Sequence, residues 1–440
     1  MAEATARGLG AGVLERLDAY AARFARDFGR IDRARWGRTY LEGLLLDGER
    51  KSIEPLSRRV VVPGWCGDTE QALQQFVNQS RWEAEAPLRR YRALLAEQFA
   101  EPAAVIVVDD TGFPKQGRCS VGVARQYSGT LGKRGNCQVA VSLHYAAPTG
   151  DYPLALRLYL PEAWTSSPER LERARVPEAE RAFRAKGAIA LELLDRVRAE
   201  GLPHRAVVAD AGYGTSGDFR RGLEERGERY LVGLTGAEVV FTAAPAWAVR
   251  PTPPGRGRPP RRRQLASRPP RAVKEVAETL ARTSVGWRQG TKGLLEAEFA
   301  WVRVWPAHRW QHGRAADDVP AAEAEGRWLL VEWRGDGTVK YALSNLPPEA
   351  TLEEAVALWK ARWQVERGYQ QLKGELGLDD FEGRSWAGFH HHATLTFLAY
   401  GFLALERARE TATGAGEGPK GPPPLPRRRR ARRPPAAQPV

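Results

Sequence analysis

The chain has 440 residues, with 67 Lys and Arg against 53 Asp and Glu, and therefore carries a formal net charge of +14. Its 42% hydrophobic and 27% charged residues are typical of globular domains. Three cysteines without a C-x-x-C pair exclude a disulfide scaffold and do not support a structural zinc site. The longest uncharged apolar run, 393–405, is shorter than the roughly 20 residues that span a bilayer, and the N-terminus has no signal-peptide core. We expect a soluble protein of a reducing, cytoplasmic compartment that does not bind membranes.

The excess positive charge lies in two segments rich in Pro and Arg. Residues 250–271 carry eight arginines, residues 420–440 carry one lysine and six arginines, and neither segment contains an acid. Few apolar residues are present there to offset the entropy of ordering, so we expect a flexible loop and a disordered tail. Such charge favours a polyanionic partner, because neutralised phosphates release condensed counterions. The alternative is a solvated Arg/Pro tract without function. For the tail the two interpretations are equally well supported.

The first hundred residues predict a helical region. Apolar residues recur there at spacings of three and four, the period of an amphipathic helix, in 12–24, 38–46 and 88–100. The pattern changes near Ala103, where the apolar run 105–108 predicts a buried strand that ends at Asp109 and Asp110.

Strand and helix patterns alternate beyond this run. We expect strands at 138–146, 152–160, 205–210 and 229–234, and helices at 177–200 and 216–226. Residues 235–341 are irregular and rich in strand-like segments, including 296–305 and 327–334. A strand at 341–346 and helices at 351–373 and 386–409 follow. This order predicts an α/β core interrupted by an insertion.

Two aspartates follow apolar strand segments and precede turns that contain glycine. They are Asp109, after the run 105–108, and Asp210, after the strand that begins near residue 205. Acids at the carboxyl ends of neighbouring strands in an open sheet commonly meet ligands and metals. Two such carboxylates repel one another unless cations lie between them, which predicts Mg²⁺ or Mn²⁺. Each aspartate by itself could equally cap the next helix or begin a turn.

A third acid is available on the helix predicted at 351–373. Arg362 and Glu366 are four residues apart and share one face, which Lys373 continues two turns later. Three acids could hold two metal ions about 3.5–4 Å apart, which clamp the attacking and leaving oxygens of a phosphodiester. An ordinary solvated face with salt bridges is the alternative, and the helix alone does not single out Glu366.

Three segments, taken in order, resemble the acidic motifs of a known family. They are VVDDTGFPKQG, VVADAGYG and the spacing W-x2-R-x3-E-x6-K, formed by Trp359, Arg362, Glu366 and Lys373. The segment LGLDDFEGRSWAGFHHH that follows is also similar. The family is the bacterial insertion-sequence DDE transposases, in the branch with a Y-x2-R-x3-E-x6-K signature. The resemblance covers roughly residues 35–405.

The resemblance implies an α/β fold with a ribonuclease H-like catalytic core, a β-rich insertion between the second and third acids, and a helical N-terminal region. The 156 residues from Asp210 to Glu366 are too many for an uninterrupted core. The implied domains are 1–100, helical and expected to bind DNA ends; 101–235, the first part of the core; 236–340, the insertion with the basic loop; 341–412, the rest of the core; and 413–440, a disordered basic tail.

The resemblance also implies which residues perform the chemistry. Asp109, Asp210 and Glu366 would be the catalytic ligands of Mg²⁺, for which Mn²⁺ would substitute, and Asp110 competes with Asp109 for the first position. The residues expected to contact DNA are Lys115, Arg125, Trp359, Arg362 and Lys373. Trp359 departs from the signature, which has Tyr, and so loses a hydroxyl but keeps a flat surface for packing or stacking.

The implied activity is Mg²⁺-dependent cleavage at transposon ends and strand transfer into target DNA. The partners would be double-stranded DNA, as transposon ends and target, and a second copy of the chain in a synaptic complex. The location would be the bacterial cytoplasm, in association with the nucleoid. Two alternatives remain: a catalytically silent DNA-binding descendant, and a metal-dependent nuclease that cuts without joining. The presence of all three acids and of Lys373 argues against the silent descendant.

Residues 117–136 are rich in glycine and carry four cations, Arg118, Arg125, Lys133 and Arg134. They lack G-x-x-x-x-G-K-[ST], so a nucleotide site is not expected. We expect a β-hairpin beside the acids that contacts DNA, with a plain glycine-rich turn as the alternative.

Three consecutive histidines, 390–392, lie in the last predicted helix. Consecutive helical side chains point in different directions and cannot converge on one ion. We therefore expect a polar patch at a helix start or facing DNA.

Overall fold

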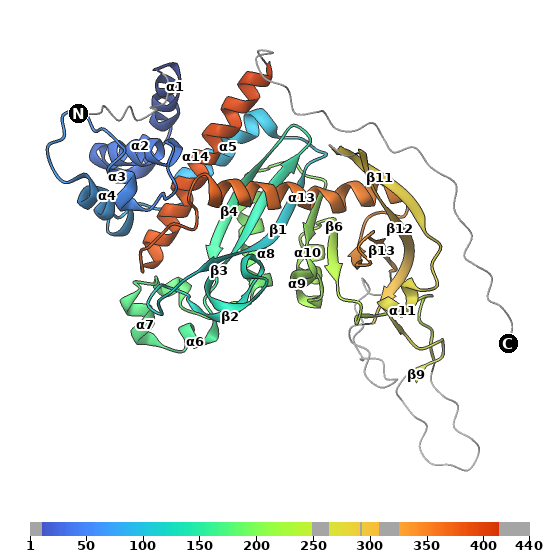
Figure 1. The fold of residues 1–440 in the computed structure, drawn as a ribbon. Helices are drawn as coiled ribbons and strands as arrows, with labels where there is room; N and C mark the ends of the chain where they lie inside the picture. The colour runs from blue at the N-terminus through green and yellow to red at the C-terminus, as the bar shows by residue number, and fades with distance from the viewer. Residues whose placement is uncertain (1–10, 249–263, 291–292, 308–324, 413–440) are drawn as a thin grey trace, which may run out of the picture. The chain divides into compact units, whose positions relative to one another are not determined.

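The computed structural model describes residues 11–248, 264–290, 293–307 and 325–412 (Figure 1). The chain divides into two units, the first within Met1–His204 and Trp363–Gly421 and the second including Arg205–Arg362. The boundary falls inside helix α13 (Leu352–Gly374). The predicted tail 413–440 and most of the basic loop lie outside the described residues. Among the helices of the described residues, none has the length and apolar character needed to cross a membrane.

The first unit begins with a series of helices. They are α1 (Ala11–Ala22), the 3-10 helix η1 (Ala25–Phe28), α2 (Ile31–Leu45), α3 (Ile53–Ser57), α4 (Thr69–Asn78) and α5 (Glu85–Phe99). Of these helices, α2, α4 and α5 pack on the last helix, α14 (Trp386–Ala412), and α1 is bonded to it. The Tyr20 hydroxyl, for example, donates to the Leu398 carbonyl at 2.8 Å.

Four antiparallel strands form the sheet of the first unit: β1 (Val105–Pro114), β2 (Ala124–Ser128), β3 (Lys133–Ala147) and β4 (Gly150–Leu158). Strand β3 pairs with the other three. Strand β1 contains the predicted apolar run but does not end at the two aspartates. Residues 109–114 keep pairing with β3, as far as Pro114 opposite Cys137. Asp109 and Asp110 therefore lie inside a strand, where successive side chains point to opposite faces.

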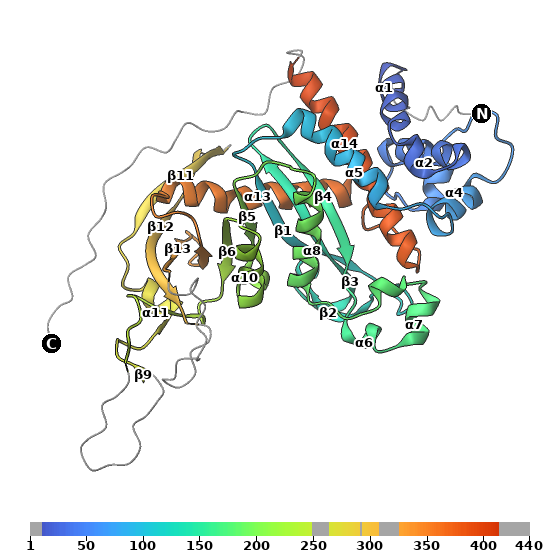
Figure 2. The ribbon, with the colours of Figure 1, turned by 180° about the vertical axis from the view of Figure 1, so that it is seen from behind.

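Helices cover both faces of this sheet. Helix α14 and the C-terminal half of α13 lie on one face, and α8 (Lys186–Arg198) lies on the other (Figures 1 and 2). Arg157 of β4 pairs with Glu192 of α8 at 2.5 Å, whereas the Phe113 ring of β1 lies 5.3 Å from the Phe389 ring of α14. Three short helices precede α8, namely α6 (Glu162–Thr165), α7 (Pro168–Arg173) and η3 (Glu178–Glu180).

The helix predicted at 177–200 becomes α-helical only at Lys186. Arginine side chains bind backbone carbonyls of the preceding segment and so stabilise a turn there. Arg181 donates to the Val176 carbonyl at 3.0 Å, and Arg184 donates to the Ala179 carbonyl at 2.8 Å. This local hydrogen bonding competes with the helix that the apolar pattern predicts.

The second unit is built on a mixed sheet. Strands β5 (Ala206–Ala209) and β6 (Tyr230–Leu234) are parallel, and α9 (Ala211–Gly214) and α10 (Gly217–Glu225) connect them. From β6 the sheet continues antiparallel through β14 (Val339–Ser344), β13 (Arg327–Trp333) and β12 (Gly293–Pro306). Strand β12 also pairs with β11 (Thr283–Gly290) and with β7 (Val239–Phe241), which pairs with β10 (Arg271–Ala272).

The remaining elements of this unit are the ribbon β8 (Trp247–Ala248) and β9 (Gln264–Leu265), and helix α11 (Val273–Ala277). Helix α11 contributes to an apolar core whose members come from most of these strands. The core includes Leu234, Val240, Val276, Val304, Leu329 and Leu343.

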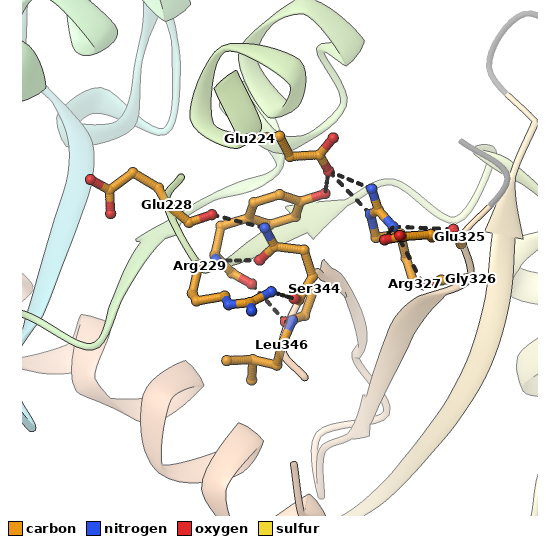
Figure 3. A network of polar contacts seen from close by, with 10 residues as sticks. Glu224, Glu228, Arg229, Glu325, Gly326, Arg327, Ser344 and Leu346 are labelled. Atoms are coloured by element: carbon orange, nitrogen blue, oxygen red, sulfur yellow. Dashed lines mark hydrogen bonds and ion pairs between the residues drawn. The ribbon is translucent and has the colours of Figure 1, made fainter. Parts of the chain in front are cut away.

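A polar network fixes helix α10 against three strands of the second unit (Figure 3). Glu224 of α10 accepts hydrogen bonds from the Tyr230 hydroxyl at 2.8 Å and from Arg327 of β13 at 3.1 Å. Ser344 of β14 donates to the Tyr230 carbonyl at 2.6 Å. Arg327 and Ser344 are buried, so these bonds form away from water and hold the β5–α9–α10–β6 segment in place.

Candidate active site

The two adjacent aspartates of β1 face different helices. Asp110 forms an ion pair with Lys186 of α8. Asp109 lies opposite Ser142 in the β1–β3 ladder, and residues directly opposite one another project to the same face. The Ser142 hydroxyl donates to the Asp109 carbonyl at 3.1 Å. Asp109 therefore lies on the face that α13 covers, and Asp110 lies on the face of α8.

Tyr369 of α13 connects this helix to the strand pair. Its buried hydroxyl donates to the Ser142 hydroxyl, which in turn donates to the Asp109 carbonyl. Burial raises the pKa of the Tyr369 phenol, and the negative charges of Asp109 and Asp110 raise it further. The phenol therefore stays protonated at neutral pH and can serve as the donor.

Lys373 makes the second contact between α13 and β1. Its ammonium group donates to the Gly112 carbonyl at 2.7 Å and to the Thr130 hydroxyl at 3.0 Å. Burial lowers the pKa of Lys373, while the nearby carboxylates, including Asp109, act in the opposite direction. Tyr369 thus meets the sheet at the level of Asp109, and Lys373 meets it three residues further along β1. The C-terminal half of α13 therefore runs beside β1 in the same direction.

Glu366 precedes Tyr369 by about one helical turn and is exposed. It lies seven residues before Lys373, so the two side chains differ by only about 20° around the helix and share a face. Within the part of the chain that the structure describes, its carboxylate forms no hydrogen bond or ion pair. The salt-bridged face that was the alternative at this position is thus not formed by Glu366, and its carboxylate is available to an external cation.

A buried polar cluster supports the same turn of α13. A Cβ atom at Gly368 would lie 2.8 Å from the His144 ring, so glycine permits the close approach of helix and sheet. His144 Nε2 lies 3.3 Å from Asp151 Oδ1, to which the Tyr400 hydroxyl donates at 2.7 Å. Burial alone would raise the pKa of Asp151, but the bonds from His144 and Tyr400 lower it. The cluster joins α13 and α14 to strands β3 and β4.

Asp210 belongs to the second unit, where it directly follows β5. Its Oδ1 accepts the Gly212 N–H at 2.9 Å and caps α9, and the described residues offer the carboxylate no other hydrogen bond or ion pair. A Cβ atom at Gly214 would lie 2.0 Å from the Gly233 carbonyl oxygen, so glycine allows α9 to pack on β6. The capping role that was the alternative for Asp210 is therefore real. One oxygen performs it, and the second oxygen is left for another ligand.

Trp359 is enclosed by the second unit and is only 7% exposed. Its indole N–H donates to Glu332 at 2.7 Å, and Glu332 also accepts from Lys360 at 2.5 Å and from Arg334 at 2.7 Å. Burial by itself would raise the pKa of Glu332, but these donors outweigh it and lower the pKa. Arg362 places its guanidinium carbon 5.3 Å from the centre of the Trp359 ring. A DNA contact by Trp359 would require its indole to leave this site.

Lys115 and Arg125, both predicted DNA contacts, differ in exposure. Lys115 turns inward and donates to the Phe381 carbonyl at 2.5 Å, and burial lowers its pKa against the opposing effect of Asp379. Arg125 is exposed on β2, and its side chain has no partner among the described residues.

The three histidines of α14 do not form a polar patch that faces DNA. His391 and His392 are only 3% and 1% exposed, so that prediction is wrong for these two residues. His392 Nδ1 lies 2.9 Å from the Tyr40 hydroxyl and its Nε2 lies 2.9 Å from the Gly377 carbonyl. His390 is also bonded internally, to the Trp386 carbonyl and the Leu158 N–H. These partners are distant in sequence or specific to the packing, so the pattern of three histidines could not reveal them.

Comparison with known proteins identifies the family. The model of the DDE superfamily endonucleases matches residues 23–294, which is more than half of the chain and includes Asp109 and Asp210. The chain belongs to the DDE superfamily endonucleases. It is 27% identical over 345 residues to a probable transposase for insertion sequence element IS701 from Microchaete diplosiphon, a match that covers 77% of this chain and 74% of that protein. These findings confirm the family resemblance predicted from the three acidic motifs, and the protein is a DDE-type transposase.

Among solved structures, the transposase is similar to a piggyBac transposase synaptic complex with hairpin DNA, determined by cryo-EM. The TM-score is 0.35 and the sequence identity is 10%, over 89% of this chain and 74% of that chain. At that score the likeness does not establish the fold, which is a mixed α/β structure with large sheets and covering helices.

The structure groups Asp109 with Glu366 and Lys373 in the first unit of the transposase, and Asp210 with Trp359 and Arg362 in the second. Among the described residues, no three His, Cys, Asp or Glu side chains form a cluster that could hold a metal ion. Sequence reasoning missed Ser142, and it placed Tyr369 on the helix face of Glu366 without giving it a role. The only sequence signal for Tyr369 is its position three residues after Glu366, and a tyrosine at that spacing is equally typical of a packed helix face.

Proposed function

We propose that this DDE transposase cuts DNA at the ends of an insertion sequence and joins those ends to target DNA, with Asp109, Asp210 and Glu366 as the metal-binding acids. The catalytic core would be ribonuclease H-like. In support, three antiparallel strands lead through helix α8 to strand β5, and Asp210 follows β5 directly.

The observation that carries this proposal is the bond between Tyr369 and Ser142. It attaches the turn of α13 next to Glu366 to the strand position opposite Asp109. Asp110 projects to the other face and is already paired with Lys186. This favours Asp109 over Asp110 as the first acid.

The residues suit a hard divalent cation such as Mg²⁺, and Mn²⁺ would substitute for it. All three candidates are carboxylates, the ligand type that Mg²⁺ prefers. The Glu366 carboxylate has no partner among the described residues, and the Asp210 carboxylate accepts only one backbone N–H there, so both retain oxygens for a metal ion. When bound, two such ions would activate a water or a DNA 3′-hydroxyl and stabilise the leaving oxygen. The protein contributes the placement of Glu366, because Tyr369 and Lys373 hold the C-terminal half of α13 beside β1.

Arg362 and Arg125 would contact DNA phosphates near the cleaved position, and Lys373 would do so with the N–H that it does not donate to Gly112 or Thr130. Trp359 and Lys115 are bonded inside the protein in this conformation, so a direct DNA contact would require each to move. The predicted helical region 1–100 would bind the transposon ends. A second copy of the chain would complete a synaptic complex in the bacterial cytoplasm, close to the nucleoid.

The test is a reaction of the purified full-length protein with labelled DNA from the ends of its own element. With Mg²⁺ the wild type should produce cleaved ends and strand-transfer products. The variants Asp109→Asn, Asp210→Asn and Glu366→Gln should still bind DNA but give neither product. The matched control is Glu169→Gln on α7, which removes an exposed acid of a surface ion pair and should leave the products unchanged.

Cleavage without joining would support a nuclease. DNA binding without any metal-dependent chemistry would support a silent descendant and would contradict the proposal. Full activity of Asp109→Asn together with loss of activity in Asp110→Asn would show that the first acid is misassigned.

A further inference from the structure

Strand β2 and the first residues of β3 form a two-stranded ribbon, closed by the turn η2 (Gly129–Leu131). The pairing runs from Ala124 opposite Cys137 to Ser128 opposite Lys133. Burial alternates along β2, where Arg125 and Tyr127 are exposed and Ser128 is buried. Arg134 lies directly opposite Tyr127 and is also exposed, so these side chains share the outward face of the ribbon.

The ribbon region carries positive charge without compensation. Residues 111–150 contain no Asp or Glu. Four exposed cations lie there, Arg118, Arg125, Lys133 and Arg134. None of their side chains forms an ion pair or hydrogen bond with any residue that the structure describes. Other exposed arginines in the same unit are paired, for example Arg173 with Glu169. An uncompensated cluster of this kind favours a polyanion, because counterions are released when phosphates are neutralised.

Tyr127 adds an aromatic surface to this face. Its side chain is 62% exposed, although most large hydrophobic residues of the first unit are buried. Single strands and unpaired bases stack on exposed aromatic rings between cations, and this stacking tolerates any base. A protein partner would gain from the ring but would have to bury the unpaired Arg125 and Arg134, which is costly without matching acids.

The ribbon is attached to the strand that carries Asp109. Thr130, in the η2 turn, donates to the Gly112 carbonyl at 3.2 Å and accepts from Lys373 at 3.0 Å. Gly112 is three residues beyond Asp109, so about 10 Å of strand separates them. DNA that met the face of α13 bearing Glu366 and Lys373 would therefore lie close to the ribbon.

We propose that the β2–β3 ribbon is a DNA-binding surface for the substrate strand next to the cleaved phosphate. Arg125 and Arg134 contact its phosphates, and Tyr127 stacks on a base that has left the duplex. This inference rests on the proposed function, since it places the ribbon beside the metal-binding acids. It also assigns DNA contacts to exposed ribbon residues rather than to Lys115, which is turned inward.

The experiment measures binding of the full-length protein to two probes by fluorescence anisotropy, without divalent ions and over a series of salt concentrations. One probe is a short mixed-sequence duplex, and the other is the same duplex with one unpaired adenine. The variants are Arg125→Gln/Arg134→Gln, Tyr127→Ala and Tyr127→Phe. The matched control is Arg173→Gln/Arg198→Gln, which removes the same charge from α7 and α8.

Arg125→Gln/Arg134→Gln should weaken binding about tenfold or more and lower the salt slope of log Kd by about two, whereas the control should keep the wild-type slope. Tyr127→Ala should bind the probe with the unpaired base about tenfold more weakly, and Tyr127→Phe should bind it like the wild type because stacking needs only the ring. Circular dichroism of each variant should match the wild type, because all these residues are exposed.

Equal salt slopes for the ribbon variant and the control would overturn the proposal, as would wild-type affinity of Tyr127→Ala for both probes. Loss of self-association in the ribbon variants with unchanged DNA affinity would identify a protein interface instead. If the wild type cleaves its end DNA while the ribbon variants bind like the wild type, only this inference fails. If the wild type neither binds nor cleaves DNA, the proposed function itself fails.

Discussion

Asp109 and Asp110 are adjacent in the chain but have different surroundings, because a strand directs successive side chains to opposite faces. Asp110 is paired with Lys186 of α8, and Asp109 faces the helix that carries Glu366. At the scale of single residues, the account therefore predicts different consequences for the same substitution at these two positions.

Asp109→Asn should lower the rate of DNA cleavage by more than about a hundredfold, since even residues that only support metal ligands typically cost 10- to 100-fold. Asp110→Asn should retain most of the activity and lose the ion pair with Lys186, a partly exposed pair whose removal costs about 1 kcal/mol or less. Rates with end DNA and urea unfolding of both variants check this prediction. The reverse pattern of activity would contradict it.

Tyr369 and Ser142 should act as positioning residues for Glu366. Tyr369→Phe removes one hydroxyl and should lower the cleavage rate by roughly three- to tenfold, because a hydrogen bond of about 1 kcal/mol no longer holds the helix. It should also raise the Mg²⁺ concentration required for half-maximal activity. Ser142→Ala should give the same effect, and the double variant should be no worse than either single one.

The matched control for this pair is Tyr145→Phe on the same strand. Its hydroxyl donates to the Pro203 carbonyl at 2.8 Å, away from α13. The control should lower the thermal stability but leave the Mg²⁺ requirement unchanged. A purely structural role for Tyr369 would be indicated if its variant lost stability without any change in Mg²⁺ dependence.

At the scale of elements, helix α13 depends on contacts with both units. Its first half is held by Glu332, which is 1% exposed and accepts bonds from Trp359, Lys360 and Arg334. Its second half is held by Tyr369 and Lys373. Tryptophan in place of the tyrosine of the family signature supplies a donor to a buried carboxylate.

Trp359→Phe should lower the free energy of unfolding by about 2 kcal/mol at pH 7, because a hydrogen bond to a charged group contributes about 1.5–3 kcal/mol. Trp301→Phe is the matched control, since the Trp301 indole donates to the neutral Ala350 carbonyl at 3.0 Å and should cost only about 1 kcal/mol. Urea unfolding of the two variants compares them directly. Equal losses would show that the charge of Glu332 adds nothing to the bond.

Elements with strong periodicity could be predicted from the sequence, and contacts between distant segments could not. The run 105–108 lies in β1, and the predicted helix 351–373 corresponds to α13. The sequence did not predict the rest of β1, because polar residues follow the apolar run and only pairing with β3 extends the strand to Pro114. The choice between Asp109 and Asp110 needs Ser142 and Lys186, which lie 33 and 76 residues away from them, respectively.

The same reason explains the residues whose environment differs from the expectation. Trp359 is buried because Glu332, 27 residues earlier, accepts its N–H, and Lys115 turns inward because the Phe381 carbonyl is within reach. Side-chain type and spacing do not encode such partners. Exposure of Arg125 and Tyr127, by contrast, follows from the simple alternation of a strand.

At the scale of the whole molecule, stability should depend on pH through the buried histidines of α14. Burial lowers the pKa of His390 and of His392 from 6.5 to about 4. The unfolded chain therefore binds more protons between these values, and stability falls as the pH falls below about 6.5. Each of these two histidines should lower the free energy of unfolding by about 2 kcal/mol when the pH falls from 7 to 5.

Urea unfolding at pH 7 and pH 5 measures this dependence. His392→Gln should unfold more easily than the wild type at pH 7 but should lose less stability than the wild type on going to pH 5. If His392→Gln lost as much stability as the wild type between pH 7 and pH 5, His392 would not be neutral and buried in the folded protein.

The proposed metal site requires Asp109, Asp210 and Glu366 to bind the same metal ions. Replacing Mg²⁺ with Fe²⁺ and adding ascorbate and peroxide generates hydroxyl radicals that cut the backbone close to the bound ion. Mapping the fragments of the full-length protein with end DNA should reveal cuts near residues 109, 210 and 366, and excess Mg²⁺ should suppress all three together. Cuts at only one of these positions, or elsewhere in the chain, would contradict the account.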